Sequence, residues 1–433
     1  MAKTWGMAGL ILLTATGSAL AAGYSIPEQS VNSVALAGGY VANTPGADAT
    51  YYNPANMSWL ENRTYLEANG TWIHLTSVKY RDDRTPAWNG KAEAENFFMP
   101  TLFAVSPDFN NFRFGFSITA PAGLAKEWRD PYPATYAEKF AVKVFEFNPT
   151  VSYRVNDRFS LAAGIRGVYV DGQIMSHGTV PVNDIPTPYG PMDSSSRIGR
   201  YMDGDAWEAG YNLALSIRPM DKMNIGITYR SKIDLSVKGH ANMSTSDVAL
   251  PALGGIVAIP GSTYNGDAGV EIPLPAVLAV AASYTFFDQL TVELGYNRTY
   301  WSSYDTLAFT YPSPLGNPVM QGAFGDPRAK SWSDTDTWRL SVAYDFKNNW
   351  ILMAGFAIDE NPAPDNTLGF ELPDADARLY SIGVRYIIND SMEIGAAYLY
   401  DDKESRHVNN QYAVGEFTNE AAHLVTIGFS YKF

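Results

Sequence analysis

The chain ends with the stretch HLVTIGFSYKF, residues 423–433, in which two kinds of side chain alternate. From Val425 to Phe433 every second residue is apolar or aromatic, and the residues between them are small or polar. A period of two residues is the pattern of a β-strand whose two faces differ. The sequence therefore predicts a final strand with an apolar face on one side only.

The same alternation recurs from about residue 64 onwards. A clear case is FRFGFSI at 112–118, and others lie at 159–166, 223–230, 338–346 and 380–386. The second face is built of Gly, Ser, Asn and Arg rather than the Lys and Glu mixture of a soluble surface, and aromatic residues such as Trp338 and Tyr398 gather near the ends of the apolar rows. Both details favour a membrane barrel, with its apolar face towards lipid, over a soluble sandwich.

Short turn signals divide these strands into hairpins. They lie at 107–111, 156–157, 219–222, 288–289, 347–349 and 389–390, and longer connections rich in Pro, Gly, Ser and Asp lie between them. Tight turns at one end and long loops at the other are typical of outer-membrane barrels. Six short turns separate seven hairpins. We therefore predict an all-β membrane protein, a 14-stranded antiparallel transmembrane β-barrel with both termini on the periplasmic side.

The N-terminal part of the chain follows other patterns. Lys3 precedes an apolar run at 7–13 and small residues that end in Ala19-Leu20-Ala21, which predicts a signal peptide over residues 1–21. Residues 22–62 are small and polar and do not alternate. We expect them to form short helical turns inside the lumen, a hatch that plugs the barrel, with a flexible linker as the alternative. The barrel would then occupy residues 63–433.

The composition argues against several classes of function. A chain with 45 acids against 31 bases, a net charge of −14, lacks the cationic surface that nucleic acids require. The absence of cysteine excludes thiolate catalysis and Cys-ligated metals. The five histidines are widely spaced, and no G-x-S-x-G motif accompanies them. We therefore expect no enzyme activity, no metal site and no cofactor.

Several segments together resemble a known family. The chain is similar to the FadL family of outer-membrane transporters of long-chain fatty acids and other hydrophobic compounds, which includes relatives that take up aromatic hydrocarbons. The resemblance spans nearly the whole mature chain, and it rests on order and spacing rather than on one motif. The segments that carry it are 22–24, the region of Gly38 and Asp48, 53–55, 117–119, 123–125, 228–231, 355–364 and 373–376.

The resemblance implies a function and a location. External loops would capture a hydrophobic solute, a pocket near the hatch would receive it, and a kink in the third strand would release it sideways, driven by the solute gradient alone. The protein would be a monomer in the outer membrane of a Gram-negative bacterium, in contact with outer-membrane lipid. The barrel assembly machinery would read its C-terminal Tyr431 and Phe433, and Asn53, Pro54 and Ala55 would shape the hatch turn.

Two further segments would serve this path. Pro121 and Gly123 are expected to end the third strand and open the wall, because Pro cannot donate to a ladder and Gly tolerates bends. An ordinary strand end is the alternative. The connection at 250–260 is apolar although it belongs outside the membrane, which marks either an interaction site or a loop tucked against the barrel mouth. Its apolar side chains are Leu250, Leu253, Ile256, Val257 and Ile259.

The resemblance leaves the substrate open between fatty acids and neutral or aromatic hydrocarbons. Fatty-acid-binding members place an Arg after strand 5 and a Lys before strand 10, where the alignment puts Ser176 and Thr335. Neither side chain carries a charge for a carboxylate, which favours an uncharged ligand. Arg166, Arg230 and Arg339 either replace those cations or balance acids in the lumen. A non-specific porin and a structural or adhesive barrel are the rival functions.

Overall fold

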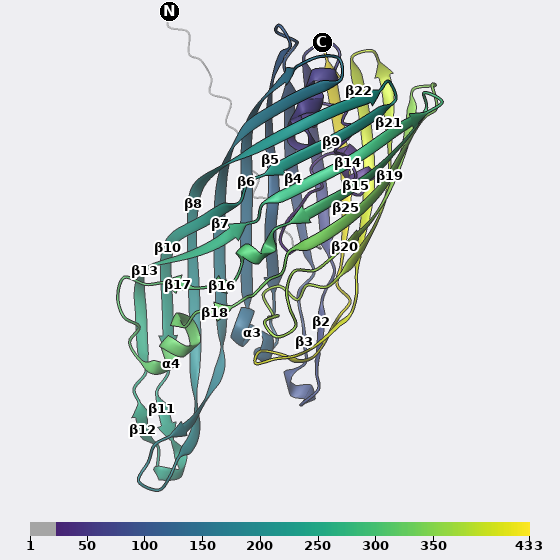
Figure 1. The fold of residues 1–433 in the computed structure, drawn as a ribbon. Helices are drawn as coiled ribbons and strands as arrows, with labels where there is room; N and C mark the ends of the chain where they lie inside the picture. The colour runs from purple at the N-terminus through teal and green to yellow at the C-terminus, as the bar shows by residue number, and fades with distance from the viewer. Residues whose placement is uncertain (1–22) are drawn as a thin grey trace, which may run out of the picture.

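The computed structural model describes residues 23–433, so the predicted signal peptide and Ala22 lie outside the described residues. Within residues 23–433, fourteen antiparallel strands pair in a closed ring, because β1 pairs with β4 on one side and with β25 on the other (Figure 1). This confirms the predicted 14-stranded barrel. In ring order the wall strands are β1 (Tyr65–Leu75), β4 (Glu95–Val105), β5 (Phe112–Glu127), β6 (Lys139–Arg154), β7 (Phe159–Ile185), β8 (Met192–Met220), β9 (Met223–Arg230), β14 (Val277–Phe286), β15 (Leu290–Thr299), β19 (Thr335–Asp345), β20 (Trp350–Asp359), β21 (Ala377–Asn389), β22 (Met392–Lys403) and β25 (Ala421–Lys432).

Short turns join neighbouring wall strands at the end of the barrel where the C-terminus lies (Figure 1). All six occur where the sequence predicted them. Asn110 and Asn111, in the turn before β5, have φ values of 55° and 71°, and Lys347 and Asn349 also have positive φ. Asn adopts this left-handed conformation more readily than most residues, which explains its place in these turns.

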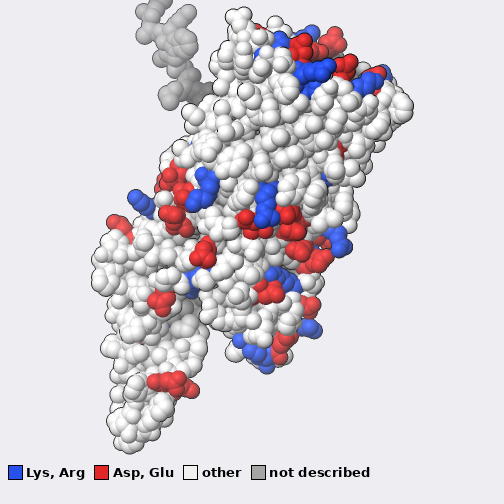
Figure 2. Space-filling model, viewed as in Figure 1, with Lys and Arg blue, Asp and Glu red and all other residues white. Residues whose placement is uncertain are grey.

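The two faces of the wall differ as the alternation predicted. Phe112 and Phe114 of β5 point outward, with exposed fractions of 44% and 54%, whereas Arg113 between them is 2% exposed. Trp338 and Arg339 of β19 show the same contrast. Figure 2 shows the outcome on one side of the molecule, a band of wall with almost no charged residue between charged clusters at its two ends. An uncharged outward band suits contact with hydrocarbon.

Beyond the ring, at the end opposite the C-terminus, β7 and β8 continue as a long hairpin (Figure 1). The outer half of β8 pairs with β10 (Ile233–Thr245), which pairs with β13 (Ser262–Leu274), and β13 pairs with β17 (Phe309–Thr310). The smaller strands form three separate sheets: β11 (Val248–Leu250) with β12 (Ile256–Ile259), β16 (Thr306–Leu307) with β18 (Arg328–Ala329), and β2 (Lys79–Asp82) with β3 (Gly90–Lys91), β23 (Arg406–Asn409) and β24 (Val414–Thr418).

Short helices fill the remaining connections. Within the described residues, none of them is long and apolar enough to cross a membrane. They are α1 (Val31–Ala35), α2 (Ala49–Tyr52), η1 (Pro54–Trp59), η2 (Pro86–Trp88), α3 (Pro131–Ala137), η3 (Pro251–Leu253), η4 (Trp301–Ser303), α4 (Pro318–Met320) and η5 (Gln321–Gly325).

Candidate transport path

The N-terminal segment, residues 23–62, packs against the inner face of the wall (Figure 1). Helix α1 contacts β20, β21, β22 and β25, and η1 contacts β5 to β8 on another side of the ring. Ser30 caps α1 reciprocally with Ser33. Asn53 accepts a hydrogen bond from the Ala55 N–H at 3.1 Å, and Pro54 follows at the first position of η1. The three residues predicted for the hatch turn therefore start a buried 3-10 helix inside the barrel.

Glycines on the wall allow this segment to come close. A Cβ on Gly395 would lie 2.8 Å from the Val31 Cγ1, and one on Gly355 would collide with the backbone of Leu36. Gly383 and Gly428 face the same helix. The inner face is thus rich in Gly because backbone and wall meet there without room for a side chain.

Polar side chains of the wall hold the segment. Glu293 of β15 accepts hydrogen bonds from the backbone N–H groups of Val41, Ala42 and Asn43 at 2.6, 3.0 and 2.9 Å. Arg339 donates to the carbonyl of Ala37. Each wall group satisfies backbone that the segment cannot pair within itself.

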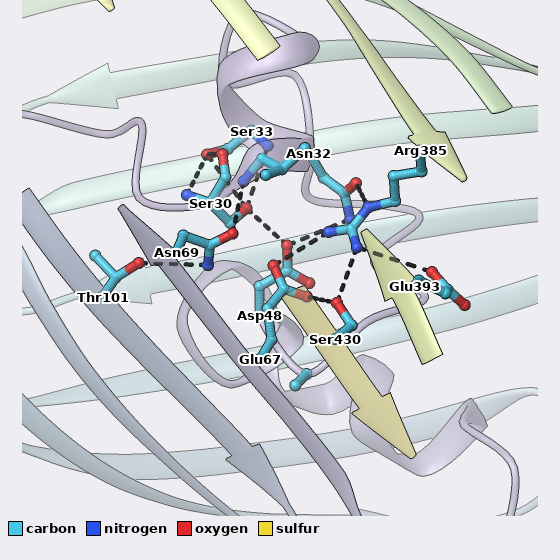
Figure 3. A network of polar contacts seen from close by, with 12 residues as sticks. Ser30, Asn32, Ser33, Asp48, Glu67, Asn69, Thr101, Arg385, Glu393 and Ser430 are labelled. Atoms are coloured by element: carbon cyan, nitrogen blue, oxygen red, sulfur yellow. Dashed lines mark hydrogen bonds and ion pairs between the residues drawn. The ribbon is translucent and has the colours of Figure 1, made fainter. Parts of the chain in front are cut away.

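A buried network surrounds Arg385 of β21 (Figure 3). Arg385 donates to the Asn32 Oδ1 at 2.5 Å and to the Glu67 Oε1 at 3.1 Å, so it joins the N-terminal segment to β1. Asp48 accepts a hydrogen bond from the Ser30 hydroxyl at 2.7 Å in the same network. Charge-assisted bonds of this kind fix geometry as well as charge.

The other lumenal arginines also have partners. Arg166 and Arg230 both pair with Glu146, Arg166 at 2.9 Å, and Arg339 lies 3.6 Å from Glu28. The expectation that they balance acids in the lumen is confirmed, and Glu28 belongs to the N-terminal segment. Two other acids have different partners: Glu293 binds backbone N–H groups, and Asp345 pairs with Lys347 at a short turn.

The expectation that Pro121 and Gly123 end the third strand is wrong. Strand β5 continues through both residues to Glu127, and its register with β6 shifts between Thr119 and Ala122. The shift is a bulge, which carries the strand past a proline without ending it.

At this bulge the N-terminal segment takes the place of a neighbouring strand. The Ala120 N–H donates to the Gln29 Oε1 at 2.8 Å, and the Gln29 amide donates to the Ala120 carbonyl at 2.9 Å. The Ile26 N–H donates to the Pro121 carbonyl at 2.8 Å, and the Gly123 N–H to the Tyr24 carbonyl at 2.9 Å. These bonds satisfy backbone groups that β4 does not reach, since β4 pairs with β5 only from Leu102 to Val105.

An apolar cavity lies beside this contact. Tyr24, Leu124, Phe140 and Trp332 are among its lining residues. A second apolar hollow, between β6, β7, β8, β10 and β13, shares Phe140, Val142 and Ile272 with the first. The two hollows therefore adjoin each other, and we refer to them together as the apolar path, which lies between the outer hairpins and Tyr24.

One ion pair lines the cavity that contains Tyr24. Lys330, 6% exposed, pairs with Glu371. Burial raises the pKa of Glu371, but the attraction of Lys330 outweighs it and holds that pKa below its ordinary value. Sequence reasoning missed Lys330, because a lysine in a long polar connection is usually solvated. Ser176 and Thr335, which the alignment singled out, are buried but do not line either hollow.

The apolar connection at 250–260 lies at the far tip of the outer hairpin (Figure 1). Leu250 packs with Val248 and with Ile185 of β7, and Leu253 and Ile259 pack against this cluster. Ile256 and Val257 remain exposed, at 60% and 46%. The loop is thus anchored on the β7–β8 hairpin rather than on the barrel mouth.

Comparison with known proteins decides the family. The model described as "Outer membrane protein transport protein (OMPP1/FadL/TodX)" matches residues 12–433. The chain belongs to this family. A long-chain fatty acid transport protein of Escherichia coli O6:H1 is 26% identical over 450 residues, with 96% of this chain and 95% of the relative covered. Outer membrane protein P1 of Haemophilus influenzae is 23% identical over 470 residues, with 98% and 97% covered.

Solved structures share the fold. A Pseudomonas aeruginosa FadL homologue has a TM-score of 0.76 at 20% identity, covering 95% of this chain and 99% of that one. The Ralstonia pickettii toluene transporter TbuX has a TM-score of 0.68 at 18% identity, covering 93% and 98%. Membership in the FadL family confirms the predicted resemblance, the outer-membrane location and a transport rather than an enzymatic role.

The Arg385 network predicts a large contrast between two arginines of one strand. Arg385→Met leaves Glu67, 1% exposed, without its cation, which should lower the free energy of unfolding by about 3–5 kcal/mol. Arg378 lies on the outward face and pairs with Glu404, and both side chains are 57% exposed. Arg378→Met should therefore lower the free energy of unfolding by less than about 1 kcal/mol. Urea unfolding of both variants in detergent measures the difference, and equal losses would show that the network does not anchor the segment.

Proposed function

We propose that this protein is a channel for passive uptake of hydrophobic compounds across the outer membrane. Solute would enter among the outer hairpins, follow the apolar path to the cavity beside Tyr24, and leave sideways through the wall between β4 and β5. The observation that carries the proposal is the position of that cavity, next to the one bulge at which the N-terminal segment replaces a wall strand within residues 23–433.

The pairing of β4 and β5 supports a sideways exit. Their ladder covers Leu102–Val105, and the next backbone hydrogen bond between them towards the outside is from the Glu93 N–H to the Glu127 carbonyl at 2.9 Å, beside an ion pair of Lys126 with Glu95 at 3.8 Å. Residues 95–101 of β4 lie between these limits without a β5 partner in the described ladder. Pro100 lies within this stretch, and proline favours strand edges because it cannot donate to a ladder.

The N-terminal segment supports the hatch assignment. It packs inside the ring and is bonded to the wall on several sides. The hollow that remains beside it is lined by polar and charged residues such as Asn43, Glu293 and Arg385, so the apolar path is the better route for a hydrophobic solute. A non-specific porin would instead keep an aqueous channel. We further propose that the barrel acts as a monomer and that the assembly machinery reads Tyr431 and Phe433, whose rings stack at 5.2 Å at the end of the chain.

The charges in the cavity favour a neutral ligand. Lys330 is already compensated by Glu371, so a carboxylate would have to displace that partner. We therefore propose neutral hydrocarbons, alkanes or aromatics, as the preferred substrates. Fatty acids are the second candidate, because Arg200, buried against Phe309 and Phe324 beside the second hollow, makes no ion pair within residues 23–433.

Restoring a regular third strand should block uptake. In the double variant Pro121→Val with Gly123→Val, uptake of radiolabelled toluene by whole cells should fall by about tenfold or more, since an unbroken ladder closes the wall. Pro149→Val on β6, a lipid-facing proline away from the break, serves as the control. Unchanged uptake at normal barrel levels would remove these residues from the path, and rapid swelling of liposomes in small sugars would favour a porin.

Removing both charges from the cavity separates the two substrate classes. In the double variant Lys330→Met with Glu371→Met, retention of a neutral hydrocarbon should stay within about threefold of the parent, because an apolar cavity binds it by burial alone. Native mass spectrometry of both proteins after exposure to an equimolar mixture of dodecane and a long-chain fatty acid measures this. The proposal of a neutral substrate would be contradicted if the parent protein retained the fatty acid in preference to dodecane and the double variant lost this preference.

A further inference from the structure

The ring closes where β25 meets β1, and two histidines face each other at this seam. The register pairs His423 of β25 directly with His74 of β1. The neighbouring strands continue the row, with Tyr400 of β22 opposite His423 and Asn96 of β4 opposite His74. The sequence separates the two histidines by almost the whole barrel, which is why their spacing gave no sign of a site.

Both imidazoles lie on the outward face of the wall. Their neighbours two positions along each strand, Trp72 and Val425, are 44% and 39% exposed. From Phe433 at the periplasmic end, ten residues of a tilted strand reach His423, a height of roughly 25 Å, which is about that of the apolar band of such barrels. The pair therefore lies at the level of the outer headgroups, in reach of water.

Hydrogen bonds and stacking hold both rings. The His74 Nδ1 lies 2.9 Å from the Asn96 Oδ1, and the His423 Nδ1 lies 2.8 Å from the Tyr398 hydroxyl. His74 stacks on Trp72 at 5.7 Å, and His423 on Tyr400 at 5.1 Å. An amide oxygen only accepts, so the His74 Nδ1 carries the proton and its Nε2 keeps the lone pair.

Neither Nε2 makes a hydrogen bond within the part of the chain that the structure describes. The ring centroids lie 5.9 Å apart, and directly opposite residues of antiparallel strands have Cβ atoms about 5 Å apart. The two imidazoles thus lie on facing strands with each Nδ1 engaged. When Tyr398 accepts from the His423 Nδ1, both Nε2 atoms keep their lone pairs, and such outer-shell bonds are typical of metal-binding histidines.

We propose that His74 and His423 bind one late first-row divalent cation through their Nε2 atoms. Imidazole suits Cu²⁺, Ni²⁺ and Zn²⁺, and Cu²⁺ binds most tightly in that series. Within residues 23–433 no group of three or more His, Cys, Asp or Glu side chains is placed to hold a metal, so water or a headgroup phosphate completes the coordination. A bound ion links the first wall strand to the last and so stabilises the closed ring.

The other histidines differ from this pair. His177 lies 2.7 Å from Glu138 and His407 lies 2.7 Å from Asp83, so their imidazoles have carboxylate partners, and His240 contacts Asn265. Within residues 23–433, none of the three faces a second histidine across a strand pair. They are removed in the test so that only the seam pair can bind.

The test uses the full-length mature barrel in detergent, without a polyhistidine tag, carrying His177→Asn, His240→Asn and His407→Asn. Titration with Cu²⁺ alone should show one ion per barrel, with nitrogen hyperfine splitting from two imidazoles in the electron paramagnetic resonance spectrum. His74→Ala and His423→Ala should each weaken binding at least tenfold and remove the two-nitrogen signature. Tyr398→Phe, which keeps the ring but removes the outer-shell hydroxyl, should weaken binding about tenfold.

The melting temperature gives an independent measurement. Cu²⁺ should raise it in the parent and leave it unchanged in either alanine variant, whose folding is checked by heat-modifiable mobility. Failure of the parent to bind one Cu²⁺, or equal affinity in parent and alanine variants, would overturn the proposal.

Discussion

A backbone N–H or carbonyl in hydrocarbon needs a partner within the protein, and the structure depends on this constraint. It requires the ring to close. The first wall strand, β1, closes it by pairing with the last, β25, along its whole length from Tyr65 to Leu75. The constraint also governs the place where the β4–β5 ladder is incomplete. At the bulge of β5 the backbone groups of Ala120, Pro121 and Gly123 find partners in Tyr24, Ile26 and Gln29. The N-terminal segment is therefore part of the wall as well as an occupant of the lumen.

The same requirement explains the chemistry of the inner face. A segment with only short helices leaves many backbone groups free, and the wall supplies Glu293, Arg339 and Arg385 to bind it. Where helix and wall touch directly, glycines such as Gly355 and Gly395 remove the side chain that would hold them apart. These charged residues and these glycines therefore serve the same end, the close attachment of the N-terminal segment.

The fold could be predicted largely from the sequence because alternation and turns are local. The alternation of Phe112 and Arg113 indicates which side chain faces outward without any information about neighbouring strands. Each short turn likewise contains an Asn or Asp that marks it in the local sequence. The proposed path was harder to predict, because it depends on contacts between distant segments. Gln29 resembles any other polar residue in the sequence, and no neighbouring residue indicates that its side chain binds the backbone of Ala120. Pro121 lies at the bulge of β5, but proline alone does not distinguish a strand end from a bulge that a remote segment supports. Lys330 was missed because its partner, Glu371, comes from another loop.

The central claim is that the N-terminal segment stays attached to the wall while solute passes beside it. A Cβ on Gly39 would lie 3.1 Å from the Cβ of Ser341, so a shift of about 0.5 Å brings the two atoms to the spacing of about 3.5–4.5 Å in a disulfide, and the natural chain has no cysteine. Whole-cell uptake of labelled toluene through the variant Gly39→Cys with Ser341→Cys, oxidised and then reduced, tests the claim most directly. Equal uptake in the two states is the predicted result. Uptake that is lost on oxidation and returns on reduction would contradict it.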